Sequence, residues 1–169
     1  MRFDVVTLFP EIFSAVRDCG ITARARMRGL WSMNCWNPRD TATDLHRTID
    51  DRPFGGGPGM VMMAEPLAQT IDAVRASGNR GPILSFAPNG ARLTDARVRE
   101  IAAAKEPIVL VCGRYEGIDE RFLESYVDEV VSLGDFVLSG GELPACALID
   151  AVVRQLPGAI KDLSASDES

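Results

Sequence analysis

The chain has 169 residues, of which 46% are hydrophobic and 25% are charged, a composition typical of one globular domain with a substantial core. No apolar run approaches the ~20 residues that a membrane-spanning helix needs, and the N-terminus lacks the basic and then apolar pattern of a secretion signal. The four cysteines form no C-x-x-C pair, which favours reduced thiols in the cytoplasm over a disulfide framework or a zinc site. His46 is the only histidine, so a histidine-based metal site is excluded.

The formal net charge of −6 argues against a general nucleic-acid coat protein, but the charge is unevenly distributed. Residues 1–115 contain 15 Lys and Arg against 12 Asp and Glu, whereas residues 116–169 contain 3 against 12. Arg24, Arg26 and Arg28 cluster near the start of the chain. Such a cluster suits a polyanionic partner, and it suits equally a solvated helix face that nearby acids balance.

The first third of the chain predicts strands and helices followed by a long loop. The expected elements are a strand over 2–8, helices over 11–18 and 21–27, and a strand over 30–36. From 39 to 59 the periodicity is lost. A loop of this length inside a compact domain is usually functional or mobile.

The rest of the chain alternates strands with helices. The expected elements are a short strand or helix lead-in at 60–63, a helix over 65–77, a strand over 82–86, a helix over 94–103, a strand over 107–112, a helix over 118–125, a strand near 130–131 and a helix over 143–155. The segment 107–112 is wholly apolar, as expected of a strand at the buried centre of a parallel sheet. Only Asp150 and Arg154 interrupt the last helix, which is therefore expected to be buried against the sheet or a second subunit.

This alternation predicts an α/β fold with a mostly parallel sheet and helices on both faces. Glycine-containing loops at 87–90, 113–117 and 134–144 each follow an expected strand. Because parallel strands end at the same edge of a sheet, we expect the three loops to meet there and form a binding crevice.

The loop over 134–144 joins the last strand to the last helix. Ser139 and Glu142 have the spacing of a capping box, which predicts that the helix begins at Gly140. The adjacent glycines would let the backbone approach a ligand closely. An ordinary strand-to-helix turn containing a glycine pair is the alternative.

Signatures of common phosphate-binding and hydrolytic sites are missing from the sequence. The glycine-rich run at 55–59 is not followed by Lys-Ser or Lys-Thr, and no G-x-G-x-x-G follows the first strand. His46, in an irregular region, gives no credible Ser–His–Asp arrangement. The backbone-rich loops instead suit a ligand held by main-chain hydrogen bonds, with catalysis by positioning rather than by covalent chemistry.

Four long motifs occur in order along the chain. They are FPEIF at 9–13, RTIDDRPFGGGPGM at 47–60, CGRYEGIDER at 112–121 and GDFVLSGGELP at 134–144. Together they closely resemble the bacterial tRNA (guanine-N1)-methyltransferases, enzymes of the SPOUT class, and the resemblance covers essentially the whole chain. It implies transfer of a methyl group from S-adenosylmethionine to N1 of guanosine 37 in tRNA, beside the anticodon.

The resemblance also implies features that the residue patterns do not reveal. These are a deep trefoil knot at the C-terminal end of the α/β domain, an obligate homodimer, and S-adenosylmethionine bent within the knot. Family members are reported to use magnesium, for which the sequence contains no dedicated site. We expect residues 1–158 to form the methyltransferase domain and 159–169 to begin a linker, with the family's C-terminal tRNA-binding domain absent from this chain.

Position by position, the resemblance assigns a cofactor-binding site, with Glu116 near the methionine part of the cofactor. The assigned residues are Pro88, Asn89, Gly90, Gly113, Glu116, Leu133, Gly134, Asp135, Phe136, Val137, Leu138, Gly140, Gly141 and Pro144. The family usually has Ser-Pro-Gln-Gly where this chain has Ala-Pro-Asn-Gly at 87–90, and often a tyrosine at Phe136. Main-chain contacts and ring stacking survive both departures.

The chemistry of guanine implies two further groups. N1 carries a proton and is a poor nucleophile until that proton leaves, so the reaction needs a base at N1 and a cation or donor at O6. Arg154 matches the family's arginine at O6; its alternative role is to pair with Asp150 and with the helix dipole. The family's base is an aspartate in the linker of the other subunit, and the alignment allows Asp167 or Glu168.

Two other functions stay open from the sequence. One is another SPOUT methyltransferase that acts on ribosomal RNA or on a different tRNA position, against which the motif at 47–60 argues. The other is a cofactor-binding dimerisation module without turnover, which the expected lack of a C-terminal domain favours.

Overall fold

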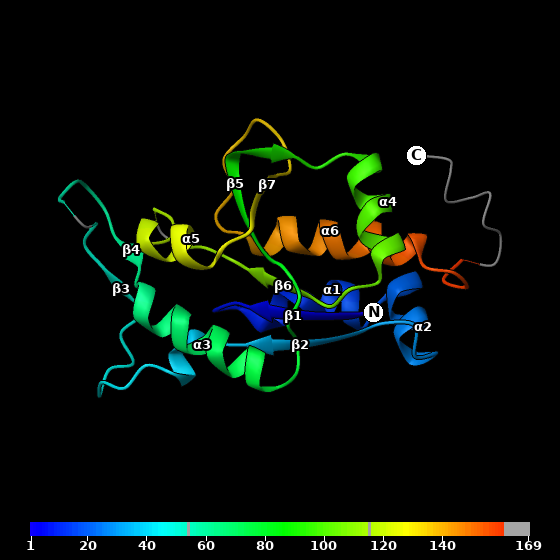
Figure 1. The fold of residues 1–169 in the computed structure, drawn as a ribbon, viewed down its shortest axis with the longest axis horizontal. Coiled ribbons are helices and arrows are strands. Elements are labelled where there is room, and N and C mark those ends of the chain that lie inside the picture. Colours follow the sequence, from blue (N-terminus) through cyan, green and yellow to red (C-terminus); the bar gives the residue numbers. More distant parts are fainter. Residues whose placement is uncertain (54, 115, 161–169) are drawn as a thin grey trace.

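A five-stranded sheet forms the centre of the computed structural model, which describes residues 1–160 apart from positions 54 and 115 (Figure 1). The strands lie in the order β2-β1-β6-β5-β7, and all neighbours are parallel. Their bounds are β1 Arg2–Val6, β2 Ser32–Trp36, β5 Ile83–Arg92, β6 Ile108–Val111 and β7 Glu129–Ser132. A separate antiparallel pair joins β3 Asp50–Asp51 to β4 Val61–Met62. The predicted α/β fold with a parallel sheet is confirmed.

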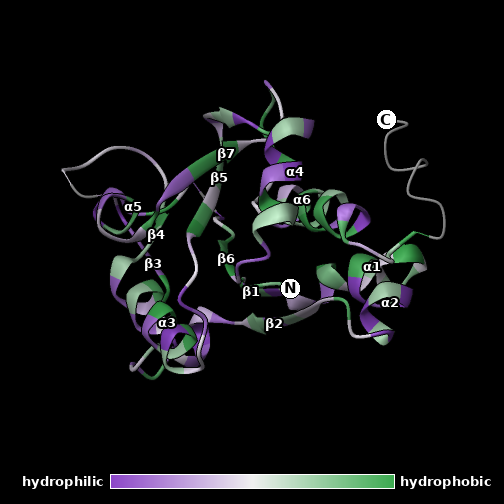
Figure 2. Ribbon diagram, turned by 45° about the vertical axis from the view of Figure 1, so that its right-hand side comes forward, coloured by the Kyte–Doolittle hydropathy of each residue, from purple (hydrophilic) through white to green (hydrophobic). Residues whose placement is uncertain are grey.

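Helices pack on both faces of this sheet. One group consists of α1 Ser14–Arg17, α2 Gly20–Met27, α4 Asp95–Ala104 and α6 Glu142–Gln155; the other consists of α3 Ala64–Ala76 and α5 Glu120–Tyr126. Short 3-10 helices occupy Pro10–Phe13 and Pro38–Asp40. Figure 2 shows α6 mostly hydrophobic, whereas α3 alternates between hydrophobic and hydrophilic residues. None of the helices in the described part of the chain is long and apolar enough to cross a membrane.

The side chains of β6 show why the sheet needs both groups of helices. Ile108 and Leu110 belong to the hydrophobic cluster that includes α6, while Val109 and Val111 belong to the cluster that includes α3. All four are buried, because successive strand residues point to opposite faces and both faces are covered. The expectation that this apolar strand lies at the centre of the sheet is confirmed.

The structure corrects the expected end of the fourth predicted strand. β5 does not end at Phe86 but continues to Arg92, so residues 87–90 belong to the strand and not to a free loop. Its pairing with β7 shifts register between Phe86 and Ala91, which leaves the intervening residues in an irregular part of the ladder. Pro88 is tolerated there because proline has no N–H to donate, and an irregular part of the ladder does not require one.

A buried carboxylate ties the first strand to its neighbours. Asp4 is 0% exposed and accepts hydrogen bonds from Arg2 Nε at 2.8 Å, Trp36 Nε1 at 2.8 Å and Asn79 Nδ2 at 2.7 Å. Asn79 also donates to the backbone oxygen of Ile108 in β6. Asp4 and Asn79 together therefore link β1, β2, the segment before β5, and β6.

We predict that replacing Asp4 with alanine lowers the free energy of unfolding by about 3 kcal/mol, because three buried or part-buried donors lose their acceptor. Urea unfolding followed by circular dichroism measures the change. Asp72→Ala, at an exposed position of α3, is the control and should stay within about 0.5 kcal/mol of the wild type. Equal losses for the two variants would contradict the role assigned to Asp4.

Candidate functional site

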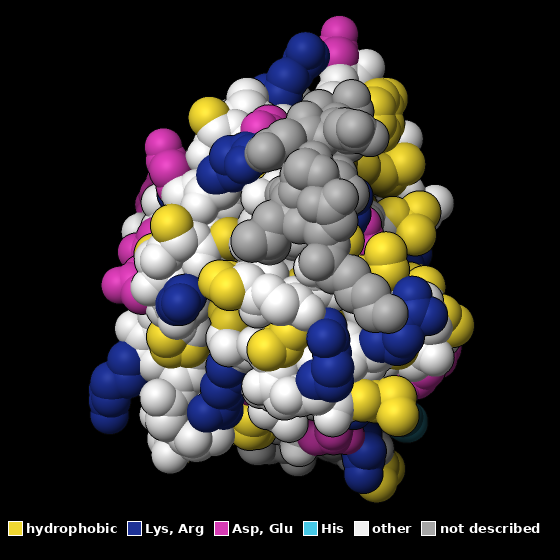
Figure 3. Space-filling view, turned by 90° about the vertical axis from the view of Figure 1, so that its right-hand side faces the viewer, with side chains coloured by type: hydrophobic (Ala, Val, Ile, Leu, Met, Phe, Trp, Pro, Cys, Tyr) yellow, Lys and Arg dark blue, Asp and Glu magenta, His cyan; other side chains and the backbone are white. Residues whose placement is uncertain are grey.

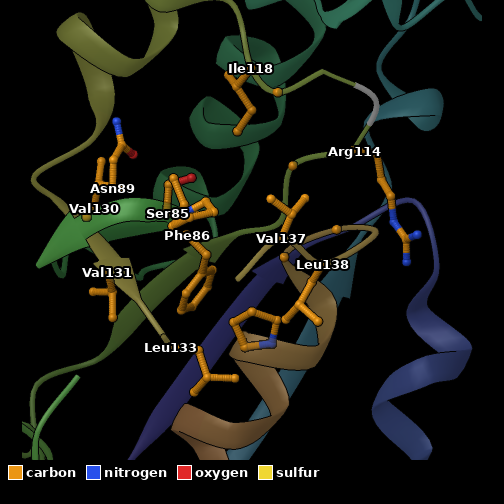
Figure 4. Close-up of a pocket in the computed structure, with 18 of the residues that line it drawn as sticks. Ser85, Phe86, Asn89, Arg114, Ile118, Val130, Val131, Leu133, Val137 and Leu138 are labelled. Atoms are coloured by element: carbon orange, nitrogen blue, oxygen red, sulfur yellow. The ribbon is translucent and has the colours of Figure 1, made fainter. Parts of the chain in front are cut away.

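A cavity of about 690 Å³ lies at the carboxyl ends of β6 and β7 and along β5, beside the first turn of α6 (Figure 4). Its walls come from 85–90 in β5, from 113–114 and 116–118 after β6, and from the segments around β7 and the start of α6. The predicted convergence of three glycine-containing segments at one edge of the sheet is confirmed. The volume falls within the range of small-molecule sites.

The interior of the cavity combines apolar side chains with closely packed backbone. Figure 4 shows Phe86, Leu133 and Leu138 grouped around one part of it. A Cβ atom on Gly90 would lie 2.6 Å from the backbone oxygen of Val130, and one on Gly141 would lie 3.0 Å from Cys112 Cα. The close approach of the wall segments therefore favours glycine at both positions, independently of any ligand.

The cavity gathers the cofactor-binding positions that the family resemblance assigns. Every one of them lines it except Asp135, which is exposed beside it in the sequence. The lining residues that the sequence did not assign to the cofactor site are Ser85, Phe86, Ala87, Arg114, Gly117, Ile118, Glu120, Leu123, Glu124, Val130, Val131 and Ser139. Spacing gave one usable signal, since positions 120, 123 and 124 share a face of α5.

The proposed catalytic groups are not part of this lining. Arg154 lies in the last turn of α6, ten residues after Pro144, and therefore about 15 Å further along the helix axis. The salt bridges within the described residues do not include a pair between Arg154 and Asp150. Asp167 and Glu168 lie outside the described residues.

An ion pair between Arg114 and Glu142 lies next to the cavity wall. The Glu142 side chain is 0% exposed, and its Oε1 accepts a hydrogen bond from Arg114 Nε at 2.5 Å. Arg114 Nη1 also donates to the backbone oxygen of Ser139 at 3.3 Å, and the guanidinium lies 4.5 Å from the centre of the Phe9 ring. Arg114 thus connects the segment after β6, the wall before α6 and the loop after β1.

This ion pair explains why the predicted capping box is wrong. α6 begins at Glu142 with Gly141 as its N-cap, and no side chain caps it. The Glu142 carboxylate cannot reach back toward Ser139 because it is buried and bound to Arg114. Ser139 contributes its backbone oxygen to Arg114 instead.

Burial dominates the titration behaviour around this pair. It raises the pKa of Glu142, although the hydrogen bond and charge of Arg114 lower it in part. Its Oε2 atom meets the geometry of a hydrogen bond with none of the described residues, although the Thr7 hydroxyl lies close enough to lower the pKa as well. Burial and the neighbouring Glu142 charge also raise the pKa of the Cys112 thiol, and they raise that of Cys146 to about 11. Both thiols are therefore neutral near pH 7 and are poor nucleophiles.

The residues that the structure describes contain no group of three or more His, Cys, Asp or Glu side chains suited to a metal ion. The use of magnesium stays a prediction from the family resemblance. The charged residues Glu116, Glu120 and Glu124 line the cavity together with Arg114.

Comparison with known proteins identifies the family. The sequence model of the family described as "tRNA (Guanine-1)-methyltransferase TrmD" matches residues 1–169. The chain belongs to this family. A tRNA (guanine-N(1)-)-methyltransferase of Thiobacillus denitrificans is 60% identical over 174 residues, covering 100% of this chain and 73% of the relative. The same enzyme of Pseudomonas syringae pv. tomato is 54% identical over 169 residues, covering 99% and 67%.

A solved structure agrees with the family assignment. The crystal structure of tRNA (m1G37) methyltransferase from Aquifex aeolicus matches 96% of this chain and 72% of its own, with a TM-score of 0.87 and 41% identity. The resemblance inferred from the four sequence motifs is thereby confirmed.

The Arg114–Glu142 pair leads to a prediction about stability and pH. Arg114→Met leaves a buried carboxylate without its cation, so the folded-state pKa of Glu142 rises further above its ordinary value of 4.5. Below pH 4.5 the carboxyl group is neutral in both the folded and the unfolded protein. As the pH rises from there toward the folded-state pKa, the free energy of unfolding falls, because the carboxyl group ionises only in the unfolded protein. The variant should therefore be destabilised by about 3 kcal/mol at pH 8 and by clearly less at pH 5.

Urea unfolding at several pH values measures this effect. The matched control is the double variant Arg114→Met with Glu142→Gln, which has no carboxylate at this position to ionise, so its loss of stability should not increase from pH 5 to pH 8. An Arg114→Met variant whose loss does not depend on pH would show that the pair does not hold a buried charge.

Proposed function

We propose that the chain transfers a methyl group from S-adenosylmethionine to N1 of guanosine 37 in tRNA. The observation that carries the proposal is family membership across residues 1–169, with relatives named for this activity. The placement of the family's cofactor positions around one cavity supports it. A substrate of this kind places the protein in the cytoplasm.

The cavity fits a nucleoside with a short charged chain. Its apolar part, which includes Phe86, Leu133 and Leu138, suits the adenine ring, while glycines keep the neighbouring backbone close. Glu116 lines the cavity, where its carboxylate suits the positive amino end of the methionine part. When bound, S-adenosylmethionine supplies an electrophilic methyl group; the protein's part is to hold the two reactants in line and exclude water.

Methyl transfer also requires control of the guanine proton. A linker acid, Asp167 or Glu168, takes the proton from N1, and Arg154 stabilises the negative charge that develops on O6. Arg154 is about 15 Å along α6 from the cavity wall at Pro144. The guanine must therefore bind between the cavity and the C-terminal end of α6.

A homodimer completes the proposed site. Leu143, Ala147, Asp150 and Arg154 share one strip of α6 by their spacing, and this chain leaves the strip partly uncovered: Leu143 is 57% exposed. The opposite side of α6 is packed in the core. A second copy placed on this strip would cover Leu143, and we assign the linker acid of each site to that copy.

The deep trefoil knot of the SPOUT class belongs to the same proposal. β5 lies between β6 and β7 in the sheet, although it precedes both in the chain. The segments that follow these strands form the cavity walls. We place the knot in these segments.

Methylation of unmodified tRNA transcripts tests the proposed function. We expect incorporation of one methyl group into a transcript with guanosine 37, detected as a block to reverse transcription at that nucleotide. The matched transcript with adenosine 37 should accept none. A methyl group at another position would favour a different SPOUT activity, and cofactor binding without any turnover would favour a dimerisation module.

Arg154→Ala should lower the single-turnover rate by about 10²-fold or more, because the variant loses a charge that acts mainly in the transition state. The affinity for S-adenosylmethionine, measured by calorimetry, should barely change.

Asp167→Asn and Glu168→Gln, made separately, should identify the base. The single-turnover rate of one variant should fall steeply, and that of the other should stay near the wild-type rate. If both remain active, the base lies elsewhere.

Mixing two inactive variants tests the shared site. If one subunit supplies Arg154 and the other supplies the linker acid, a heterodimer of Arg154→Ala and the inactive linker variant contains one intact site. Activity should then return after subunit exchange. No recovery in a mixture shown to contain heterodimers would place both groups on one subunit.

A further inference from the structure

A second hollow lies at the amino ends of the strands, at the opposite end of the sheet from the cavity. It measures about 600 Å³ and is lined at the amino ends of β1 and β2 by four cations, Arg2, Arg17, Arg26 and Lys105. We call these four residues and the space between them the basic hollow. We propose that the basic hollow binds the phosphate backbone of the RNA substrate, away from the nucleotide that is methylated; this rests on the proposed function.

The charge of the basic hollow is only partly neutralised. Among the described residues that line it there is no Asp or Glu. Arg17 and Arg26 share one carboxylate, that of Asp18, at 3.3 and 3.7 Å, and both side chains are 37% exposed. Two arginines and one aspartate leave a net positive charge. Arg2 is bound to Asp4 and adds little, whereas Lys105 is exposed.

Two further exposed cations lie close in sequence to Arg26 and Gly78, which line the basic hollow. Arg24 is exposed on α2, and Arg80 is exposed in the segment before β5. Figure 3, which looks onto this side of the molecule, shows Lys and Arg side chains gathered over its lower half. Because the chain as a whole carries a net charge of −6, the cations that line the basic hollow are a local exception and would orient a polyanion toward it.

The backbone at Lys105 gives an independent indication. Lys105 is the residue after α4 and has a left-handed conformation, with φ 53° and ψ 18°. Glycine is the favoured residue at this position of a helix end, because a side chain there costs free energy. Residues kept in such conformations cluster at functional sites. A lysine that only served the helix dipole would fit equally well within the last turn itself.

The form of the basic hollow suits a polyanion better than a single small anion. Its cations come from β1, α1, α2 and the end of α4, and none of them is fully buried. A site for one phosphate usually encloses it with desolvated donors, whereas contacts to a nucleic-acid backbone are exposed and independent of sequence. The hollow and the cavity lie at opposite ends of the sheet, so only an extended ligand would reach both.

Removal of the charges tests the proposal. The variants are Arg17→Gln, Arg26→Gln and Lys105→Gly, singly and together. The control is Arg92→Gln, because Arg92 is exposed at the end of β5 and lines neither the cavity nor the basic hollow. Binding of unmodified tRNA is measured by fluorescence anisotropy at several salt concentrations. The triple variant should raise Kd by about tenfold and reduce the slope of log K against log salt by about two units.

Lys105→Gly separates a binding role from a structural one. Glycine relieves the left-handed backbone, so the midpoint of thermal unfolding should rise by about 2–4 °C while tRNA affinity falls. A lysine that acts only on the helix would give the reverse: lower stability and unchanged RNA affinity. Either unchanged RNA affinity in the triple variant or an equal loss in Arg92→Gln overturns the proposal.

The test also distinguishes this proposal from the function on which it rests. Affinity for S-adenosylmethionine should be the same in all these variants, since the cavity lies at the other edge. Salt-dependent tRNA binding through the basic hollow without methyl transfer to guanosine 37 would support the surface and contradict the proposed activity. An equal loss of affinity for a nucleoside diphosphate would indicate a small-anion site and would overturn the assignment to RNA.

Discussion

The buried carboxylate of Glu142 fixes the point at which α6 begins, and much of the site depends on it. A charge in an apolar environment is unfavourable unless a cation accompanies it, and Arg114 provides that cation. The same guanidinium binds the backbone at Ser139 and lies against Phe9, so the wall before α6 is held to the loops after β1 and β6. One ion pair thus sets both the shape of the cavity and the rotation of the helix whose other side we assign to a second subunit.

Local sequence patterns predicted the architecture well where they matched the tertiary environment. The apolar strand at 108–111 is central, and the glycine-containing segments meet at one edge, because parallel order follows from the alternation of strands and helices. The pattern failed at 87–90, where Pro-Asn-Gly normally indicates a free turn, but these residues form an irregular stretch inside β5, between its two pairings with Val131 of β7. It failed again at Glu142, whose spacing from Ser139 indicated a cap although burial directs the side chain to Arg114.

Sequence patterns likewise predicted one part of the candidate site and missed another. Motif positions were sufficient to find most of the cavity lining, because those residues follow one another along continuous segments. Residues of β5 and β7 were missed because nothing in their local pattern shows that they face a ligand, and the spacing of positions 120, 123 and 124 was the one signal for those of α5. Arg154 is a different case: a rigid helix separates it from the cavity, so its role depends on how the substrate and a second copy are placed, and a single chain does not contain that information.

The order of the strands has a consequence for how the protein is made. β1 pairs with β6, so Phe3 meets Ile108 only after more than a hundred further residues have been synthesised. At the usual pace of about 5 to 20 residues per second, this delay lasts about 5 to 20 s. During that time the apolar strand β1 has β2 on one side and an open edge on the other. The nascent chain therefore leaves one edge of β1 unpaired for seconds, and such unpaired strand edges are prone to aggregation.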